Sequence, residues 1–214
     1  MFVDHEKLVN AFRKAQQISD TYQTYVLDGK RLPISVDDLV SVISDIYRIE
    51  INMKLVDFRS KHLRGMIEKI GSESVNVYIK KEQEAETIRF VTVKELSHSI
   101  IDEPEDWNPA GCDTIDGFIE AEQFSVANGE SPSLLPPEYI QGEAIAEAVA
   151  IEIMFPYDLR ADCYAAYMKK ERSIQDLSQQ FGMPQFAIYR AFSENYRAVA
   201  DKVWAEIESE TYKG

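Results

Sequence analysis

The chain has 214 residues, of which 45% are hydrophobic, and this length suits one substantial core. Its formal net charge of −14 repels phosphate backbones, so we do not expect it to bind nucleic acid. The sequence opens with scattered charges, approaches no apolar run of about 18 residues and has no CxxC pair, which favours a cytoplasmic protein without membrane spans or a disulfide framework.

The first half of the chain alternates between helical and strand patterns. Apolar residues at helical spacing predict an amphipathic helix over residues 5–28, which could pack on the core or meet a partner. Ser35 and Asp38 form an N-cap pattern that begins a second helix. Alternating apolar residues over 49–55 then predict a half-buried strand.

Two further strands follow as a hairpin around Gly71, over residues 63–70 and 75–80. Because three strands lie close together and the rest of the chain has helical patterns, we expect an α+β fold. It would consist of a small antiparallel sheet of about three strands packed against a mainly helical body.

Helical patterns dominate the second half. A helix is predicted over residues 84–101 and another over 138–155, where Pro156 ends it. Between them, residues 102–130 hold nine acidic residues and no Lys or Arg, which indicates a surface excursion with a short helix near 114–128.

These patterns divide the chain into three parts. An N-terminal helical extension covers residues 1–32, a central domain covers 33–156 with its acidic excursion at 102–135, and a C-terminal helical region covers 157–214.

One motif in the helix over 84–101 carries chemistry. Zinc peptidases of the zincin type use His-Glu-x-x-His on a helix, where two histidines bind Zn²⁺ and the glutamate is the general base. Here the segment reads Lys94-Glu95-Leu96-Ser97-His98, so Glu95 and His98 are present and Lys94 replaces the first histidine. Glu-x-x-His also occurs by chance, and an exposed glutamate with a hydrogen-bonded helical histidine is the simpler alternative.

A second helix strengthens the motif. The segment from Glu143 to Pro156 places alanines at 144, 146, 148 and 150, and such small residues permit close helix packing. Gluzincins take a third metal ligand, a glutamate, from a helix packed in this way.

Taken together, the two segments resemble the ImmA/IrrE family of metallopeptidase-like proteins over about residues 33–195. The resemblance implies that the helical body is zincin-like and that residues 33–156 form a metallopeptidase-like domain. The matching positions are Arg89, Phe90, Thr92, Glu95, His98, Glu143, Ala146, Ala150 and Pro156. The resemblance implies that Glu95 is the general base, that His98 and Glu143 are zinc ligands, and that position 94 would be a ligand. Asp102 stands where the family often has a further histidine, and Glu147 would lie in the second shell.

Lys94 changes this chemistry. An ammonium cannot bind a metal until it loses its proton, which near pH 7 costs about 4–5 kcal/mol at an ordinary pKa. We therefore expect no cofactor, with the Lys94 ammonium in the metal position, paired with Glu143, Glu95 or both. In the alternative, His98, Glu143 and Asp102 hold zinc or a harder ion, with Glu147 as a spare oxygen donor.

Three functions follow from these alternatives. The first is a catalytically impaired regulatory protein that binds a protein partner, such as a transcriptional repressor encoded beside it on a phage or mobile element. The second is an active metal-dependent endopeptidase with altered ligands. The third is a structural interaction module that uses the acidic excursion or the N-terminal helix. The sequence leaves the oligomeric state open.

Residues 173–192 also resemble a helix-turn-helix, with Gly182 in the turn. Their only charged residues are Asp176 and Arg190, whereas helices that read DNA bring several cations to phosphates. We therefore interpret this segment as packing helices.

Overall fold

The computed structural model describes residues 4–26, 32–58, 63–102 and 137–211. The first part runs α1 (His5–Tyr25), α2 (Val36–Tyr47), β1 (Glu50–Val56), β2 (Gly65–Ile70), β3 (Ser74–Lys80) and α3 (Ala85–Ile101). The second part runs α5 (Pro137–Met154), α6 (Tyr157–Met168), α7 (Ile174–Phe181), α8 (Gln185–Phe192) and α9 (Glu194–Thr211). The α+β class is confirmed, and the excursion with its expected short helix lies outside the described residues.

The sheet is mixed rather than antiparallel, which corrects the expected strand pairing. Its order is β1-β3-β2: the β2–β3 hairpin is antiparallel as predicted, whereas β1 pairs with β3 in parallel. The physical reason is burial. Val75, Val77 and Ile79 are almost fully buried, and the central position gives β3 a strand neighbour at each edge. Met53 and Leu55 of the edge strand β1 are exposed instead.

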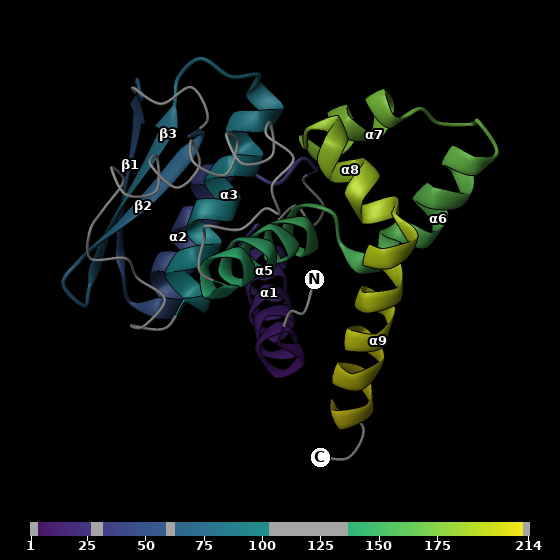
Figure 1. Cartoon of the computed structure of the whole chain (residues 1–214), viewed down its shortest axis with the longest axis horizontal. Coiled ribbons are helices and arrows are strands. Elements are labelled where there is room, and N and C mark those ends of the chain that lie inside the picture. Colours follow the sequence, from purple (N-terminus) through teal and green to yellow (C-terminus); the bar gives the residue numbers. More distant parts are fainter. Residues whose placement is uncertain (1–3, 27–31, 59–62, 103–136, 212–214) are drawn as a thin grey trace, which may run out of the picture.

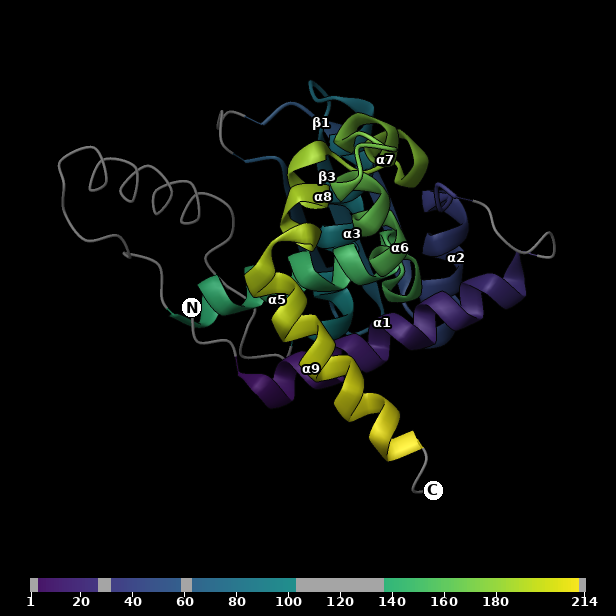
Figure 2. The ribbon, with the colours of Figure 1, turned by 90° about the vertical axis from the view of Figure 1, so that its right-hand side faces the viewer.

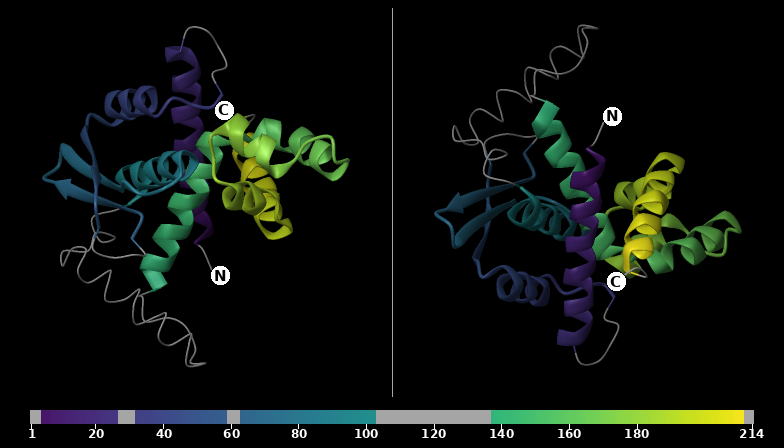
Figure 3. Two further views of the ribbon diagram at one scale, coloured as in Figure 1. Left: turned by 90° about the horizontal axis from the view of Figure 1, so that it is seen from above. Right: turned by 90° about the horizontal axis from the view of Figure 1, so that it is seen from below.

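The elements form successive layers (Figures 1 and 3). Helices α2 and α3 lie beside the sheet, α1 and α5 cross behind them, and α6–α9 lie on the far side. One apolar core includes residues from all these layers, so α1 packs as part of the body. No described helix is long and apolar enough to cross a membrane.

Local signals fix the ends of several helices. The Ser35 hydroxyl accepts the backbone N–H of Asp38 and begins α2 as predicted, a cap that contributes about 1 kcal/mol. Gly182 ends α7 in the left-handed conformation, where φ is 60°. Helices α8 and α9 are separated at Ser193, which has extended backbone and accepts the N–H of Tyr196 to begin α9.

Helix α9 lies across α1 near the two ends of the chain (Figure 2). His5 of α1 pairs with Glu206 of α9 at 2.8 Å, and Arg13 pairs with Glu210. Both pairs are exposed, so each contributes little to stability.

Candidate functional site

Helix α3 carries the candidate site because it is covered on more than one side. It packs against β2 and β3 on one side and α5 on another. Apolar and polar residues of α3 are therefore buried alike, and only 5% of the Glu95 side chain and 8% of the His98 side chain are exposed. The hydroxyls of Thr92 and Ser97 donate to carbonyls one turn earlier, which satisfies them inside the helix.

Lys94 joins α3 to α5 through two ion pairs. Its Nζ lies 2.6 Å from Oε2 of Glu143 and 3.0 Å from Oε1 of Glu95. The buried alanines of α5, among them Ala146 and Ala150, permit this approach of the two helices. The ammonium thus pairs with both carboxylates that the resemblance places around a metal position.

The surroundings keep Lys94 charged. Burial opposes the ammonium, but the carboxylates of Glu95 and Glu143 outweigh burial and hold the pKa of Lys94 above its ordinary value. The pKa of Glu143 shifts the other way: Lys94 and His98 outweigh desolvation and hold it well below its usual range. Although 57% of the Glu143 side chain is exposed, both of its carboxylate oxygens face cations on α3.

His98 lies between two carboxylates. Its Nδ1 is 2.9 Å from Oδ2 of Asp102, the C-cap residue of α3, and its Nε2 is 3.2 Å from Oε1 of Glu143. The second contact lacks the alignment of a hydrogen bond, so buried Nε2 has no hydrogen-bond partner. Burial opposes the imidazolium, but Asp102 and Glu143 outweigh it and raise the pKa of His98 to about 10.

Glu147 lies one turn after Glu143 and contacts a different helix. Its Oε2 is 3.2 Å from Nη1 of Arg190 on α8. Burial raises the pKa of Glu147 despite the attraction of Arg190 and Lys94. This residue therefore connects the cluster to the C-terminal helices.

The residues present do not fit a zinc ion. Zinc needs deprotonated ligands that converge on one point. Here the Lys94 side chain contacts one oxygen of Glu143 at 2.6 Å, and Nε2 of His98 faces the other at 3.2 Å. Asp102 lies at Nδ1 of His98 and Glu143 lies at Nε2. An ion bound to either nitrogen would therefore have only one of these two carboxylates beside it. Over the described ranges, no group of three or more His, Cys, Asp or Glu is arranged to hold a metal.

Strand β2 passes directly over the site at Gly65. A Cβ at this glycine would lie 2.5 Å from Cγ1 of Val91 and 2.8 Å from both Cγ and Oε1 of Glu95. Only glycine permits this approach. In the described part of the sheet β2 pairs only with β3, so its other edge has no strand neighbour there.

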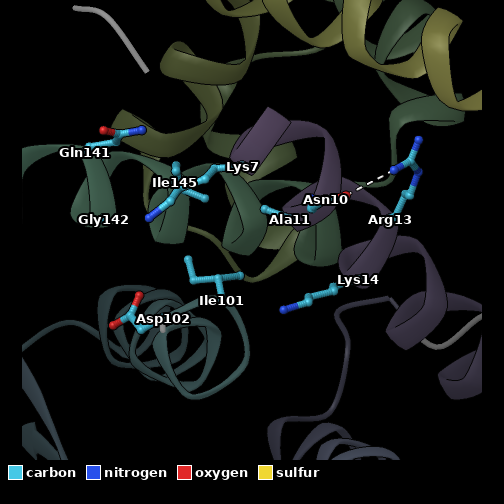
Figure 4. A pocket seen from close by; sticks show the side chains of 10 residues that line it. All are labelled: Lys7, Asn10, Ala11, Arg13, Lys14, Ile101, Asp102, Gln141, Gly142 and Ile145. Carbon is cyan, nitrogen blue, oxygen red and sulfur yellow. Dashed lines mark hydrogen bonds between the residues drawn. The ribbon is translucent and has the colours of Figure 1, made fainter. Parts of the chain in front are cut away.

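A cavity of about 340 Å³ lies on the other side of Asp102 (Figure 4). Its lining comes from α1, the end of α3 and the beginning of α5: Lys7, Asn10, Ala11, Arg13, Lys14, Ile101, Asp102, Gln141, Gly142 and Ile145. Lys14 donates to the carbonyl of Ile100 at 2.7 Å, and Arg13 pairs with Glu210. Lys14 thus complements the dipole at the C-terminal end of α3, whereas Arg13 joins α1 to α9.

Sequence reasoning missed a buried polar network below the site. Arg160 of α6 lies 2.7 Å from Glu152 of α5, and the two side chains are 6% and 1% exposed. Glu152 also accepts from Tyr196 at 2.8 Å and from Trp204 at 2.9 Å. The available signal was a single glutamate within the apolar run from Val149 to Phe155, since a buried charge needs partners.

No family model and no curated protein matches this sequence. Among solved structures, the chain is similar to a Mycobacterium tuberculosis transcriptional regulator, with 13% identity and a TM-score of 0.43. The match covers 86% of this chain and 50% of that chain, so this sequence spans about half the length of that regulator.

Proposed function

We propose that this protein is an ImmA/IrrE-like, metallopeptidase-fold regulatory protein that binds a protein partner without hydrolysing it. One observation carries the proposal: the Lys94 ammonium lies between Glu95 and Glu143. A general base in this position needs a metal-bound water to activate. Glu95 is instead occupied by a fixed cation, which favours binding over hydrolysis.

The surroundings of the cluster support a protein as the ligand. The edge of β2 offers backbone groups for an extended segment, a common mode of peptide recognition. On α8, Phe186 is 45% exposed and Tyr189 is 54% exposed, and α8 contacts the cluster through Arg190 and Glu147. Exposed aromatic residues are enriched at protein interfaces. The resemblance suggests a transcriptional repressor as the partner.

Site-specific crosslinking tests this proposal. A photoreactive amino acid is placed at Met66 on β2, and in a control protein at Lys202, which is exposed on α9. Each protein is irradiated with the purified products of neighbouring repressor genes. We expect crosslinking of an intact repressor at Met66 and none at Lys202. Cleavage of the repressor, or crosslinking at Lys202 alone, would overturn the proposal.

A further inference from the structure

The free edge of β1 lies on the opposite side of the sheet from the candidate site. β1 pairs only with β3 in the described part of the sheet, so its other side has no strand neighbour there. The sheet lies at the side of the molecule away from α6 and α9 (Figure 1). An open edge strand is a template for pairing with another chain.

The hydrogen bonds show which backbone groups face outward. The N–H of Glu50 donates to Glu73 at 2.7 Å, and the carbonyl of Val56 accepts from Lys81 at 3.0 Å. Backbone groups alternate in direction along a strand, so even-numbered residues of β1 face β3. The N–H and C=O groups of Ile51, Met53 and Leu55 therefore point to the open edge.

The two faces of β1 differ in chemistry. Ile51, Met53 and Leu55 share one face, and Met53 and Leu55 are 39% and 56% exposed. Glu50 and Lys54 lie on the other face with Asn52 between them. The Lys54 ammonium lies 5.6 Å from the Tyr78 ring centroid, and Asn52 donates to Glu50 at 3.4 Å. The exposed strand thus has an apolar face and a face with one charge of each sign.

We infer that β1 pairs antiparallel with β1 of a second copy, about a twofold axis at Asn52. In this register Glu50 lies opposite the partner's Lys54, and Lys54 lies opposite the partner's Glu50. Asn52 faces the partner's Asn52. The backbone N–H and C=O groups of Ile51 form hydrogen bonds with those of the partner's Met53. The apolar faces of the two strands then lie side by side. A twofold interface requires such self-complementarity.

Charge selects this register over its neighbours. If the two strands shift by two residues relative to each other, both ion pairs are lost. If they shift by four, Glu50 faces the partner's Glu50 or Lys54 faces the partner's Lys54. Opposite charges across an antiparallel pair stabilise it and like charges destabilise it. The charged pairs also fall at the sites without backbone hydrogen bonds, where opposing side chains are closest.

The dimer would be independent of partner binding. β2 lies at the other edge of the sheet, so pairing through β1 leaves the strand over Glu95 accessible. A pair of seven-residue strands is smaller than a stable interface of about 1,000 Å². We therefore expect a reversible dimer that forms at tens to hundreds of micromolar, a range of about −5 to −7 kcal/mol in binding free energy.

A charge-swap experiment tests the inference. Sedimentation velocity is measured for the whole chain, for Glu50→Lys and for Lys54→Glu, up to about 300 µM so that the weak dimer is covered. Each variant places like charges opposite each other, so we expect its dimer to weaken at least tenfold. An equimolar mixture of the two variants pairs opposite charges again and should form a heterodimer. Lys202→Glu on α9 is the control for an added negative charge and should leave the dimer unchanged.

Each other outcome overturns the inference. The inference fails if the original chain stays monomeric up to about 300 µM. It also fails if both variants dimerise as strongly as the original chain, or if the equimolar mixture of the two variants stays monomeric. Circular dichroism of both variants confirms that the exposed substitutions leave the fold intact.

Discussion

At the scale of single residues, Lys94 gives the site its chemistry. Its ammonium pairs with two carboxylates, and its 2.6 Å contact with Oε2 of Glu143 joins α3 to α5. His98 provides a second cation at the same glutamate, oriented by Asp102. The cluster is therefore an ion-pair network whose members depend on one another.

Replacing Lys94 with Met should destabilise the protein. The change leaves the buried Glu95 carboxylate without its cation, while solvent screens the more exposed Glu143. We expect a loss of about 2 kcal/mol in the free energy of unfolding by urea, below the usual cost of breaking a fully buried pair. The double variant Lys94→Met/Glu95→Gln should recover part of that loss. An unchanged stability for Lys94→Met would contradict the role of the ammonium.

The stability contributed by His98 should depend on pH. Its folded pKa of about 10 exceeds the ordinary value of 6.5, so its contribution is fully present below pH 6.5 and is lost as pH rises toward 10. The difference in unfolding free energy between the original chain and His98→Gln should shrink over that interval. Nuclear magnetic resonance titration of the imidazole measures the pKa directly, and a midpoint near 6.5 would refute the ion-pair description.

At the scale of elements, the sequence predicted helices, caps and the hairpin better than it predicted which strands pair. The hairpin, the Ser35 cap and the helix carrying Lys94 were predicted, because turn residues, caps and periodicity are local signals. The parallel pairing of β1 with β3 was not, because it depends on which distant strand buries its apolar face. The exposure of Met53 and Leu55 has the same origin.

The candidate site shows the same division. The resemblance placed Lys94 near Glu143 and Glu95, and its charge predicted a pair with one or both of them; both pairs are present. The contact of Glu147 with Arg190 and the pairing of Glu152 with Arg160 join helices whose packing no local pattern specifies. The functional roles of these residues stay predictions.

The approach of β2 to α3 predicts opposite effects at two glycines. Gly65→Ala should cost about 1–3 kcal/mol, because its Cβ would overlap Val91 and Glu95. Gly142→Ala is the matched control: it lies in α5 with open space around it, and alanine should stabilise the helix by about 0.5–1 kcal/mol. Thermal unfolding of both variants measures the contrast. Equal effects at the two positions would contradict the close packing of β2.

The network of Glu152 and Arg160 predicts strong coupling between α5 and α6. Glu152→Leu leaves the buried guanidinium without its carboxylate and should cost about 3–5 kcal/mol. The double variant Glu152→Leu/Arg160→Met removes both charges and should be more stable than Glu152→Leu alone. Urea unfolding of the four proteins gives the coupling free energy. Additive losses would show that the pair is not a unit.

At the scale of the whole molecule, the fold combines a binding scaffold with two open strand edges. β2 lies over the ion-pair cluster, and β1 lies on the other side of the sheet with a self-complementary charge pattern. The C-terminal helices reach the cluster through Arg190 and are fixed by the network around Glu152. Under the two proposals, the β2 edge would bind a partner and the β1 edge would bind a second copy.

The zinc content of the purified protein tests the central claim most directly. The original chain and Lys94→His are purified without chelator or nickel, incubated with zinc, desalted and measured by elemental mass spectrometry. We expect no stoichiometric zinc in the original chain, because the Lys94 ammonium already pairs with the carboxylates of Glu143 and Glu95. Lys94→His replaces the cation with a second imidazole and should bind about one zinc per chain, the stoichiometry of a His-Glu-x-x-His site. Stoichiometric zinc in the original chain would contradict the account and make an altered metallopeptidase the function to test.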